Sequence, residues 1–148
     1  MENRVKQKKF VSLVLYLHNT QNEVVPFFQK VLPVFRDNFT NFEIVCVNDA
    51  CTDGTIGVLK EYLEENHCSE MVNIIHMSFF HGLESAMNAG RDLAIGDFIY
   101  EFDTAYVDYP SERYGIYCPI DLIRLIARLE TIRKVSGPIF PLPLLVLL

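Results

Sequence analysis

The stretch Glu43–Thr55, EIVCVNDACTDGT, decides the fold because it joins an apolar run to an acidic turn. The continuous apolar run is typical of a strand buried on both faces of a parallel sheet. The turn contains Gly54, and the residues after it return to apolar character at helical spacing. A buried strand, a polar turn and a helix in this order predict one unit of an α/β domain.

Working outward from this stretch, apolar runs of the same kind recur along the chain. The predicted strands are residues 10–17, 42–47, 72–77 and 97–102. The predicted helices are residues 22–35, a segment opened by Asp53, and residues 82–94. Pro33 should kink or shorten the first of them. Strands that alternate with helices indicate right-handed crossovers, so we predict a Rossmann-like, three-layer α/β/α fold with a mostly parallel sheet.

Polar side chains follow each predicted strand. They are His18 and Asn19, Asn48 and Asp49, His81 before Gly82, and Asp103. Ligands of open parallel sheets bind outside the carboxyl ends of the strands, so these residues predict a binding site. The turn after the second strand offers acceptors for a base or a ribose, although Asp53 in that turn is also suited to capping a helix. Neither a phosphate loop nor a dinucleotide fingerprint follows any strand, which argues against ATPases and NAD-dependent dehydrogenases.

Length and composition favour one globular domain over the whole chain, 1–148, with half of its residues hydrophobic. The formal net charge is -6 and the basic residues form no stripe, so we expect no nucleic-acid partner. The four cysteines lack metal-ligand spacing, and the polar N-terminus lacks the pattern of a signal peptide. We therefore expect a reduced, cytoplasmic protein.

The segment 111–148 is predicted to hold a helix that starts at Pro119 and an apolar tail that ends GPIFPLPLLVLL. This tail is shorter than the roughly 20 residues that a spanning helix needs. We expect it to pack as a core segment. The alternative is a peripheral contact with the inner face of a membrane, because basic residues precede the tail.

Four ordered stretches of the chain resemble the signatures of the family 2 glycosyltransferases. Glu43–Thr55 resembles EIIVVDDGSTDGT, and Val11–Asn19, VSLVLYLHN, resembles VSVVIPTYN. His81–Gly90, HGLESAMNAG, resembles NxGxxxAxNxG, and Ala94–Asp103, AIGDFIYEFD, resembles AxGDYIxxLDxD. The resemblance covers residues 11–110, and four signatures in order are far more specific than one.

The resemblance implies a GT-A fold, in which the first two loops surround the base and ribose of a nucleotide-diphosphate sugar. The donor-binding positions that it implies are Leu17, His18, Asn19, Asn48, Asp49, Asp53, His81, Gly82 and Asp103. Asp103 would also bind a divalent metal, Mg²⁺ or Mn²⁺, that neutralises the diphosphate. The sugar acceptor would be a lipid or a glycan, and Asp108 within YVDYP resembles the aspartate of the polyprenyl-phosphate sugar transferases, which would imply a role in cell-envelope polysaccharide synthesis.

The sequence also departs from the family pattern. Asn48 replaces an aspartate, and Ala105 replaces the second carboxylate of the DxD motif, for which Asp108 is a substitute or merely a turn residue. The resemblance implies a general base that follows DxD in an acceptor half, and from the length of the chain we expect this half to lie outside the present sequence. Glu101 and Glu112 match no catalytic position, and salt bridges are the better expectation for both.

Two functions therefore stay open: a sugar transferase, or a nucleotide-sugar-binding module that has lost catalysis or acts beside a partner subunit. A nucleotidyltransferase would need a glycine-rich, basic loop after the first strand, which the sequence lacks.

Overall fold

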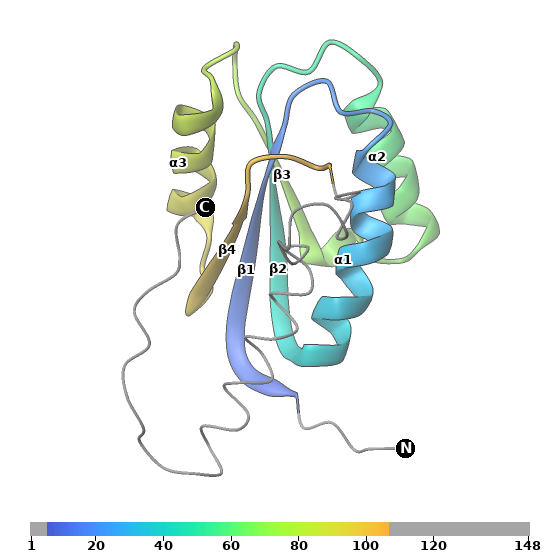
Figure 1. Cartoon of the computed structure of the whole chain (residues 1–148), viewed down its shortest axis with the longest axis vertical. Helices are drawn as coiled ribbons and strands as arrows, with labels where there is room; N and C mark the ends of the chain where they lie inside the picture. Colours follow the sequence, from blue (N-terminus) through green and yellow to red (C-terminus); the bar gives the residue numbers. More distant parts are fainter. Residues whose placement is uncertain (1–5, 107–148) are drawn as a thin grey trace, which may run out of the picture.

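The computed structural model describes residues 6–106, which form a four-stranded, fully parallel sheet with the strand order β3-β2-β1-β4 (Figure 1). The strands are β1 (Gln7–Leu17), β2 (Phe39–Asn48), β3 (Val72–His76) and β4 (Phe98–Phe102). The stretch that decides the fold supplies the second half of β2, which lies inside the sheet between β1 and β3. Its burial on both faces follows from that central place.

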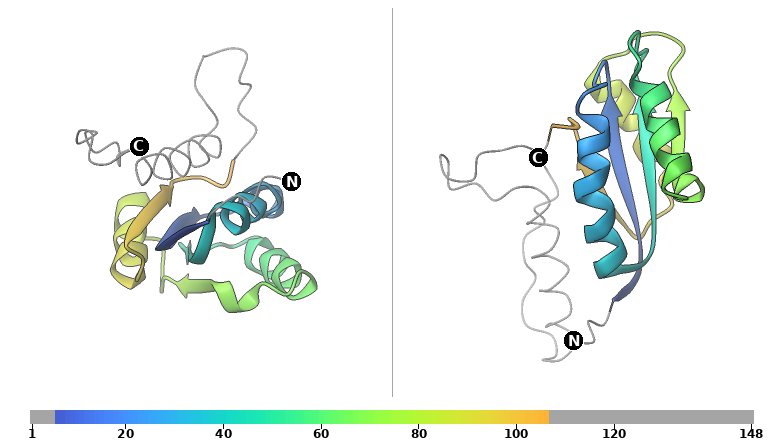
Figure 2. Two further views of the ribbon diagram at one scale, coloured as in Figure 1. Left: turned by 90° about the horizontal axis from the view of Figure 1, so that it is seen from below. Right: turned by 90° about the vertical axis from the view of Figure 1, so that its right-hand side faces the viewer.

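The helices form two layers, one on each face of the sheet (Figure 2). They are α1 (Val24–Asn38), α2 (Thr55–Glu65) and α3 (Leu83–Leu93), and a short 3₁₀ turn, Ser69–Met71, precedes β3. Helices α1 and α2 pack against each other on one face, and α3 covers β1 and β2 on the other. This arrangement confirms the predicted three-layer α/β/α fold.

The alternation of side chains along the two central strands produces two cores. Leu13 of β1 and its partner Ile44 of β2 face α1 and α2. Val14 and Val45, one position further along, face α3. The larger core contains aromatic and aliphatic side chains of the helices, namely Phe27, Phe28, Val31, Phe35, Leu59 and Leu63. Burial of these apolar side chains is the main force that holds the layers together.

Helix α1 differs from the prediction because it continues through Pro33 and ends at Asn38, without a break at the proline. A proline inside a helix removes one backbone hydrogen bond. Here the buried side chains on either side of it, Leu32, Val34 and Phe35, keep the helix against the sheet. Tertiary packing therefore overrides a local signal, and α1 runs directly into β2.

A buried carboxylate ties the amino ends of the strands to the loop between α3 and β4. Glu43 of β2 accepts hydrogen bonds from the Ser12 hydroxyl at 2.6 Å and from the Ile95 N–H at 2.8 Å. The Ser12 oxygen in turn accepts the Gly96 N–H at 2.8 Å. A Cβ atom at Gly96 would lie 2.5 Å from the Ser12 backbone nitrogen, so only glycine permits this approach.

The predictions about the C-terminal part, namely Asp108, Glu112, the helix at Pro119 and the apolar tail, fall outside the described residues. Within residues 6–106, none of the helices has the length and apolar character that crossing a bilayer requires. The three cysteines of this range, Cys46, Cys51 and Cys68, are free thiols.

Gly90 brings α3 close to the sheet and provides a test of the packing. A Cβ atom there would lie closer than 3.0 Å to methyl carbons of Val14 and Val47. Replacement of Gly90 by alanine should therefore destabilise the fold by about 1–3 kcal/mol through overpacking, despite the higher helix propensity of alanine. Chemical denaturation measures the difference. The control is Gly57→Ala in α2, where nothing lies within 4 Å, and this change should be neutral or stabilising by up to ~1 kcal/mol. Equal effects of the two substitutions would contradict the close packing.

Candidate functional site

The carboxyl ends of the four parallel strands lie at the same end of the sheet, as the sequence analysis predicted. Leu17 of β1 pairs with Asn48 of β2, and Asn48 pairs with His76 of β3. Phe102 of β4 pairs with Leu15 of β1, which places Asp103 beside the end of β1. The predicted binding residues therefore come from loops that leave one end of the sheet, called here the carboxyl end of the sheet.

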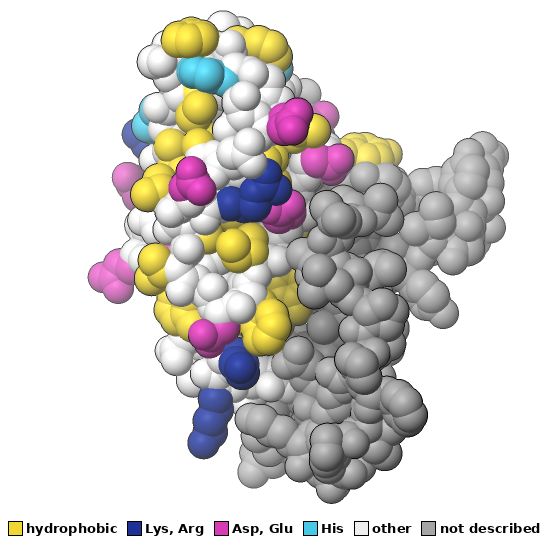
Figure 3. Space-filling view, turned by 90° about the vertical axis from the view of Figure 1, so that its left-hand side faces the viewer, with side chains coloured by type: hydrophobic (Ala, Val, Ile, Leu, Met, Phe, Trp, Pro, Cys, Tyr) yellow, Lys and Arg dark blue, Asp and Glu magenta, His cyan; other side chains and the backbone are white. Residues whose placement is uncertain are grey.

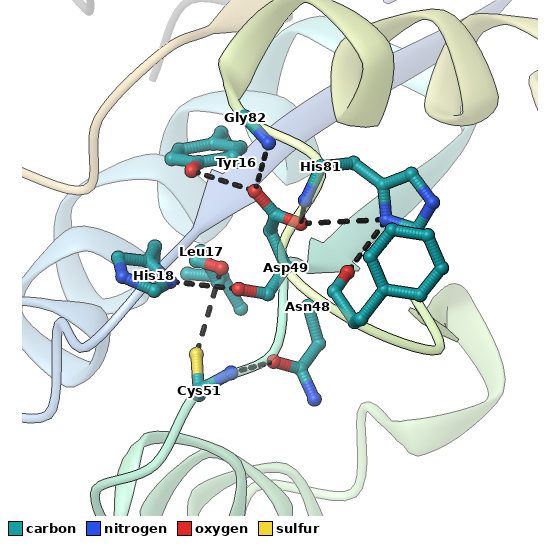
Figure 4. Close-up of polar contacts among 9 residues, drawn as sticks. Tyr16, Leu17, His18, Asn48, Asp49, Cys51, His81 and Gly82 are labelled. Atoms are coloured by element: carbon teal, nitrogen blue, oxygen red, sulfur yellow. Dashed lines mark hydrogen bonds and ion pairs between the residues drawn. The ribbon is translucent and has the colours of Figure 1, made fainter.

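Asp49 lies at the centre of this region, and its side chain is fully buried (Figure 4). The carboxylate accepts three hydrogen bonds, from the His81 N–H at 2.8 Å, the Gly82 N–H at 2.9 Å and the Tyr16 hydroxyl at 2.9 Å. These bonds join the end of β2 to β1 and to the loop before α3. Asp49 therefore supports the loops directly, and its predicted contact with a nucleotide stays a prediction.

Two opposing effects set the pKa of the Asp49 carboxyl. Burial acts to raise it, but hydrogen bonds from the His81 N–H, the Tyr16 hydroxyl and the Gly82 N–H outweigh burial and hold the pKa below its usual value. For Tyr16, burial and then the bond to Asp49 raise the pKa to about 12. The pair is therefore an ionised carboxylate and a neutral phenol at neutral pH.

Asn19 and Asp53 hold the first two loops together. The Asn19 side-chain oxygen accepts the Thr52 N–H at 2.8 Å and the Asp53 N–H at 3.3 Å. The Asp53 carboxylate accepts the Gln21 N–H at 3.2 Å and the Thr55 N–H at 3.0 Å. The bond from the Thr55 hydroxyl is the main cause that lowers the pKa of Asp53. Asp53 thus satisfies a free N–H in the first turn of α2, as a capping residue does, and also spans the two loops.

Asn48 supports the turn that follows β2. Its side-chain oxygen accepts the Cys51 N–H at 2.9 Å, and its amide nitrogen donates to His76 Nδ1 at 2.9 Å. Within the turn, Ala50 has a φ of 53° and Asn19 of the neighbouring loop has a φ of 50°. Asparagine tolerates this left-handed conformation, whereas alanine is strained by it.

Both predicted histidines lie at the carboxyl end of the sheet and are partly buried. His18 donates from Nδ1 to the Asp49 carbonyl at 2.7 Å. The His81 ring lies against the Phe79 ring, with centroids 4.0 Å apart, and its Nδ1 donates to the Phe79 carbonyl at 2.5 Å. Neighbouring protein groups therefore fix both ring orientations.

Asp103 is exposed and makes none of the hydrogen bonds or ion pairs found within residues 6–106. No group of three His, Cys, Asp or Glu side chains in that range is arranged to hold a metal. Mg²⁺ usually keeps several waters and binds through one or two carboxylates and substrate phosphates, so a single free carboxylate is compatible with such an ion. The second predicted ligand, Asp108, lies outside the described residues.

Glu101 forms the salt bridge that the sequence analysis favoured. Its carboxylate accepts two hydrogen bonds from Arg91 of α3, at 2.9 Å and 3.2 Å. Because Arg91 already engages this carboxylate, we do not assign Glu101 a catalytic role.

Sequence reasoning missed several contributors to the site. Tyr16 and Gln21 were not singled out as site residues, and Cys51 was considered only as one of four cysteines without metal-ligand spacing. Phe79 and Phe80 were also missed, and both are strongly exposed next to His81. Two adjacent aromatic residues in a predicted loop were the available signal, because exposed apolar clusters often mark binding surfaces.

Comparisons with known proteins agree with the fold. The family model described as Glycosyl transferase family 2 matches residues 12–111. The chain is 29% identical over 101 residues to the uncharacterized glycosyltransferase sll0501 of Synechocystis sp., covering 68% of this chain and 31% of that protein. It is also 29% identical over 100 residues to the uncharacterized glycosyltransferase YkcC of Bacillus subtilis, covering 68% of this chain and 30% of that protein. The chain thus spans about a third of the length of these relatives.

Solved structures share the fold. The mannosyltransferase PcManGT from Pyrobaculum calidifontis, in complex with GDP-Man and Mn²⁺, superposes with a TM-score of 0.56 at 18% identity. The match covers 63% of this chain and 26% of that one. A structure of S. aureus TarS, residues 1–349, gives a TM-score of 0.54 at 18% identity, covering 90% of this chain and 38% of that one. Such likeness supports the GT-A type of α/β fold.

The network around Asp49 predicts a dependence of stability on acid. Because its pKa is lower in the folded protein, Asp49 contributes stability above its unfolded pKa, and this contribution is lost as pH falls through the folded pKa. Asp49→Asn keeps the shape but places an N–H donor among three donors, and should destabilise the fold by about 1–3 kcal/mol at pH 7. Denaturation from pH 7 to pH 3 should show a smaller loss for the variant than for the unsubstituted chain. The control, Asp103→Asn, should leave the acid dependence unchanged; parallel curves for Asp49→Asn and the unsubstituted chain would refute this role.

The strained turn predicts a stabilising substitution. Ala50→Gly should raise the free energy of unfolding by up to ~1 kcal/mol, since glycine adopts positive φ without the steric penalty that alanine carries. The matched control is Ala94→Gly, where φ is −68° and the same change should destabilise. A loss of stability in Ala50→Gly, measured by thermal unfolding, would mean that the turn does not hold this conformation in solution.

Proposed function

Because the chain belongs to glycosyl transferase family 2, we propose that it binds a nucleotide-diphosphate sugar at the carboxyl end of the sheet and transfers the sugar to a lipid or glycan acceptor. The observation that carries the proposal is that Asp49, at the end of β2, joins the neighbouring strand ends. Its buried carboxylate accepts hydrogen bonds from Tyr16 of β1 and from the loop between β3 and α3, and its carbonyl accepts one from His18 of the loop after β1. Loops that leave adjacent parallel strands are where such folds bind nucleotides. The relative in complex with GDP-Man and Mn²⁺ supports this class of donor.

The binding roles divide between supporting and contacting residues. Asn19, Asn48, Asp49 and Asp53 use their side-chain acceptors within the protein, so we assign them to fixing the loops. The predicted residues left to contact the donor through side chains are His18, His81 and Asp103. The Gly82 N–H and the Leu17 carbonyl already bond to Asp49, so we assign both residues to supporting the loops. Because the supporting bonds already order the loops, binding would require little further ordering.

Asp103 directly follows β4, and in the sheet β1 lies between β4 and β2. Two strand spacings, at about 4.8 Å each, put the ends of β4 and β2 on the order of 10 Å apart. A span of this order suits a donor whose nucleoside lies near the loops of β1 and β2 and whose diphosphate lies near Asp103. A divalent ion bound by Asp103, Mg²⁺ or Mn²⁺, would neutralise the charge of the diphosphate leaving group.

We assign no acceptor-activating base within residues 6–106, since Glu101 and Glu43 are both engaged with protein donors. The group that deprotonates the acceptor hydroxyl would then come from residues beyond this range or from a partner chain. A lipid-linked acceptor would bring the protein to the cytoplasmic face of a membrane.

A nucleotide-sugar-binding module without catalysis is the second candidate. Ala105, which stands where the family's second DxD carboxylate would be, is fully buried and has no group for a metal. A module of this kind would bind the donor without needing a divalent ion.

Thermal unfolding of the full chain with UDP-, GDP- and dTDP-sugars, with and without Mn²⁺, tests both candidates. A ligand at 100 times its dissociation constant stabilises the native state by about 2.7 kcal/mol, which corresponds to a rise in Tm of roughly 5–10 °C. The transferase predicts a rise that Mn²⁺ enhances and Asp103→Ala weakens, whereas the module predicts a rise that Mn²⁺ does not change. Asp92→Ala, an exposed aspartate of α3, is the matched control. No shift with any sugar nucleotide would reject both candidates.

A further inference from the structure

The loop between β3 and α3 exposes two aromatic side chains to which the proposed function assigns no role. Phe79 is 64% exposed and Phe80 is 58% exposed. Figure 3 shows hydrophobic and histidine side chains gathered at one extremity of the face that carries α3. Exposing a phenyl ring to water is unfavourable, so adjacent exposed rings beside a binding region point to a ligand that covers them.

Phe80 differs from Phe79 in its partner. Its ring centroid lies 4.8 Å from that of His18, in a tilted arrangement, whereas Phe79 packs on its neighbour His81. Phe80 thereby connects the loop after β3 with the loop after β1. The two rings form a small aromatic wall, called here the Phe80–His18 wall.

The Phe80–His18 wall is fixed before any ligand arrives. The His18 ring is oriented by its bond to the Asp49 carbonyl at 2.7 Å. The backbone next to Phe80 is anchored by the His81 and Gly82 N–H groups, which donate to the Asp49 carboxylate. A ring that already packs against an ordered neighbour loses little conformational freedom when a flat ligand covers it.

We propose that Phe80, supported by His18, is the stacking platform for the nucleobase of the donor. The inference rests on the proposed function and adds to it a residue that selects for a heteroaromatic base. The wall joins the loops of β1 and β3, whereas Asp103, which would face the diphosphate, follows β4. Because His18 Nδ1 donates to a carbonyl, the other ring nitrogen, Nε2, is left for a polar contact with the base.

The free energy of stacking a base on an aromatic ring gives the loss of nucleotide affinity expected when the Phe80 ring is removed. Removal of such a ring weakens binding by roughly ten- to a hundredfold. The loss should appear with UDP, GDP and ADP and with the corresponding monophosphates, since all of them carry the base. It should be absent with inorganic pyrophosphate, which binds through charge alone.

Calorimetric titration of the full chain with these probes compares Phe80→Ala and Phe80→Leu with the unsubstituted protein. The leucine variant keeps an apolar side chain but removes the aromatic ring. The matched control is Phe98→Ala at the start of β4, where the phenyl ring is 42% exposed and lies far from the carboxyl end of the sheet. We expect weaker nucleotide binding in both Phe80 variants, unchanged binding in Phe98→Ala, and unchanged pyrophosphate binding throughout.

A direct optical test is available because the chain has no tryptophan. Phe80→Trp places a single indole on the wall, and a stacked base should quench its fluorescence, whereas the indole of Phe98→Trp should not respond. Undiminished nucleotide affinity in Phe80→Ala, or no quenching in Phe80→Trp when calorimetry detects binding, overturns the platform and leaves the proposed function standing. Absence of nucleotide binding by the unsubstituted chain overturns both.

Discussion

The buried carboxylate of Asp49 is the interaction on which the carboxyl end of the sheet depends. It accepts one hydrogen bond from β1, through Tyr16, and two from the loop before α3. A neutral side chain of similar size would have fewer acceptor positions for these donors. The resulting bonds to an ionised group are stronger than bonds between neutral groups, which explains why a fully buried charge is tolerated here.

A second buried carboxylate, Glu43 in the middle of β2, makes a similar set of bonds near the start of β4. Asp49 fixes the residues that precede α3, and Glu43 with Ser12 fixes Ile95 and Gly96, which follow it. The helix is thus attached to the central strands at both ends, and Gly90 allows close contact between them. The stretch that decides the fold therefore provides both attachments. One rigid strand positions the loops on which a ligand would depend.

The sequence predicted the layers well because burial leaves a periodic pattern. The alternating strands and helices were right, and the polar strand ends do meet. The expected shortening of α1 at Pro33 was wrong, because the packing of Val34 and Phe35 outweighs the local preference of proline. The sequence could not separate the residues that support the loops from those that are free to contact a ligand. A sequence pattern does not show which side-chain acceptors already receive hydrogen bonds from the protein. Asp49 and Phe80 illustrate this: the first is enclosed by donors, and the second becomes prominent only through its exposure and its contact with His18.

The same reasoning changes how the asparagine at position 48 is understood. Read from the sequence, Asn48 is an aspartate position that has lost its charge. In the structure its oxygen accepts the Cys51 N–H, as an aspartate oxygen would, while its amide nitrogen donates to His76. An aspartate has no such hydrogen, so the ring of His76 would have to supply it. Asn48 and His76 therefore form a matched pair that preserves the turn after β2. The loss of charge at this position is for that reason weak evidence for a degenerate site. Whether the chain is catalytic depends mainly on whether Asp103 binds the proposed metal ion.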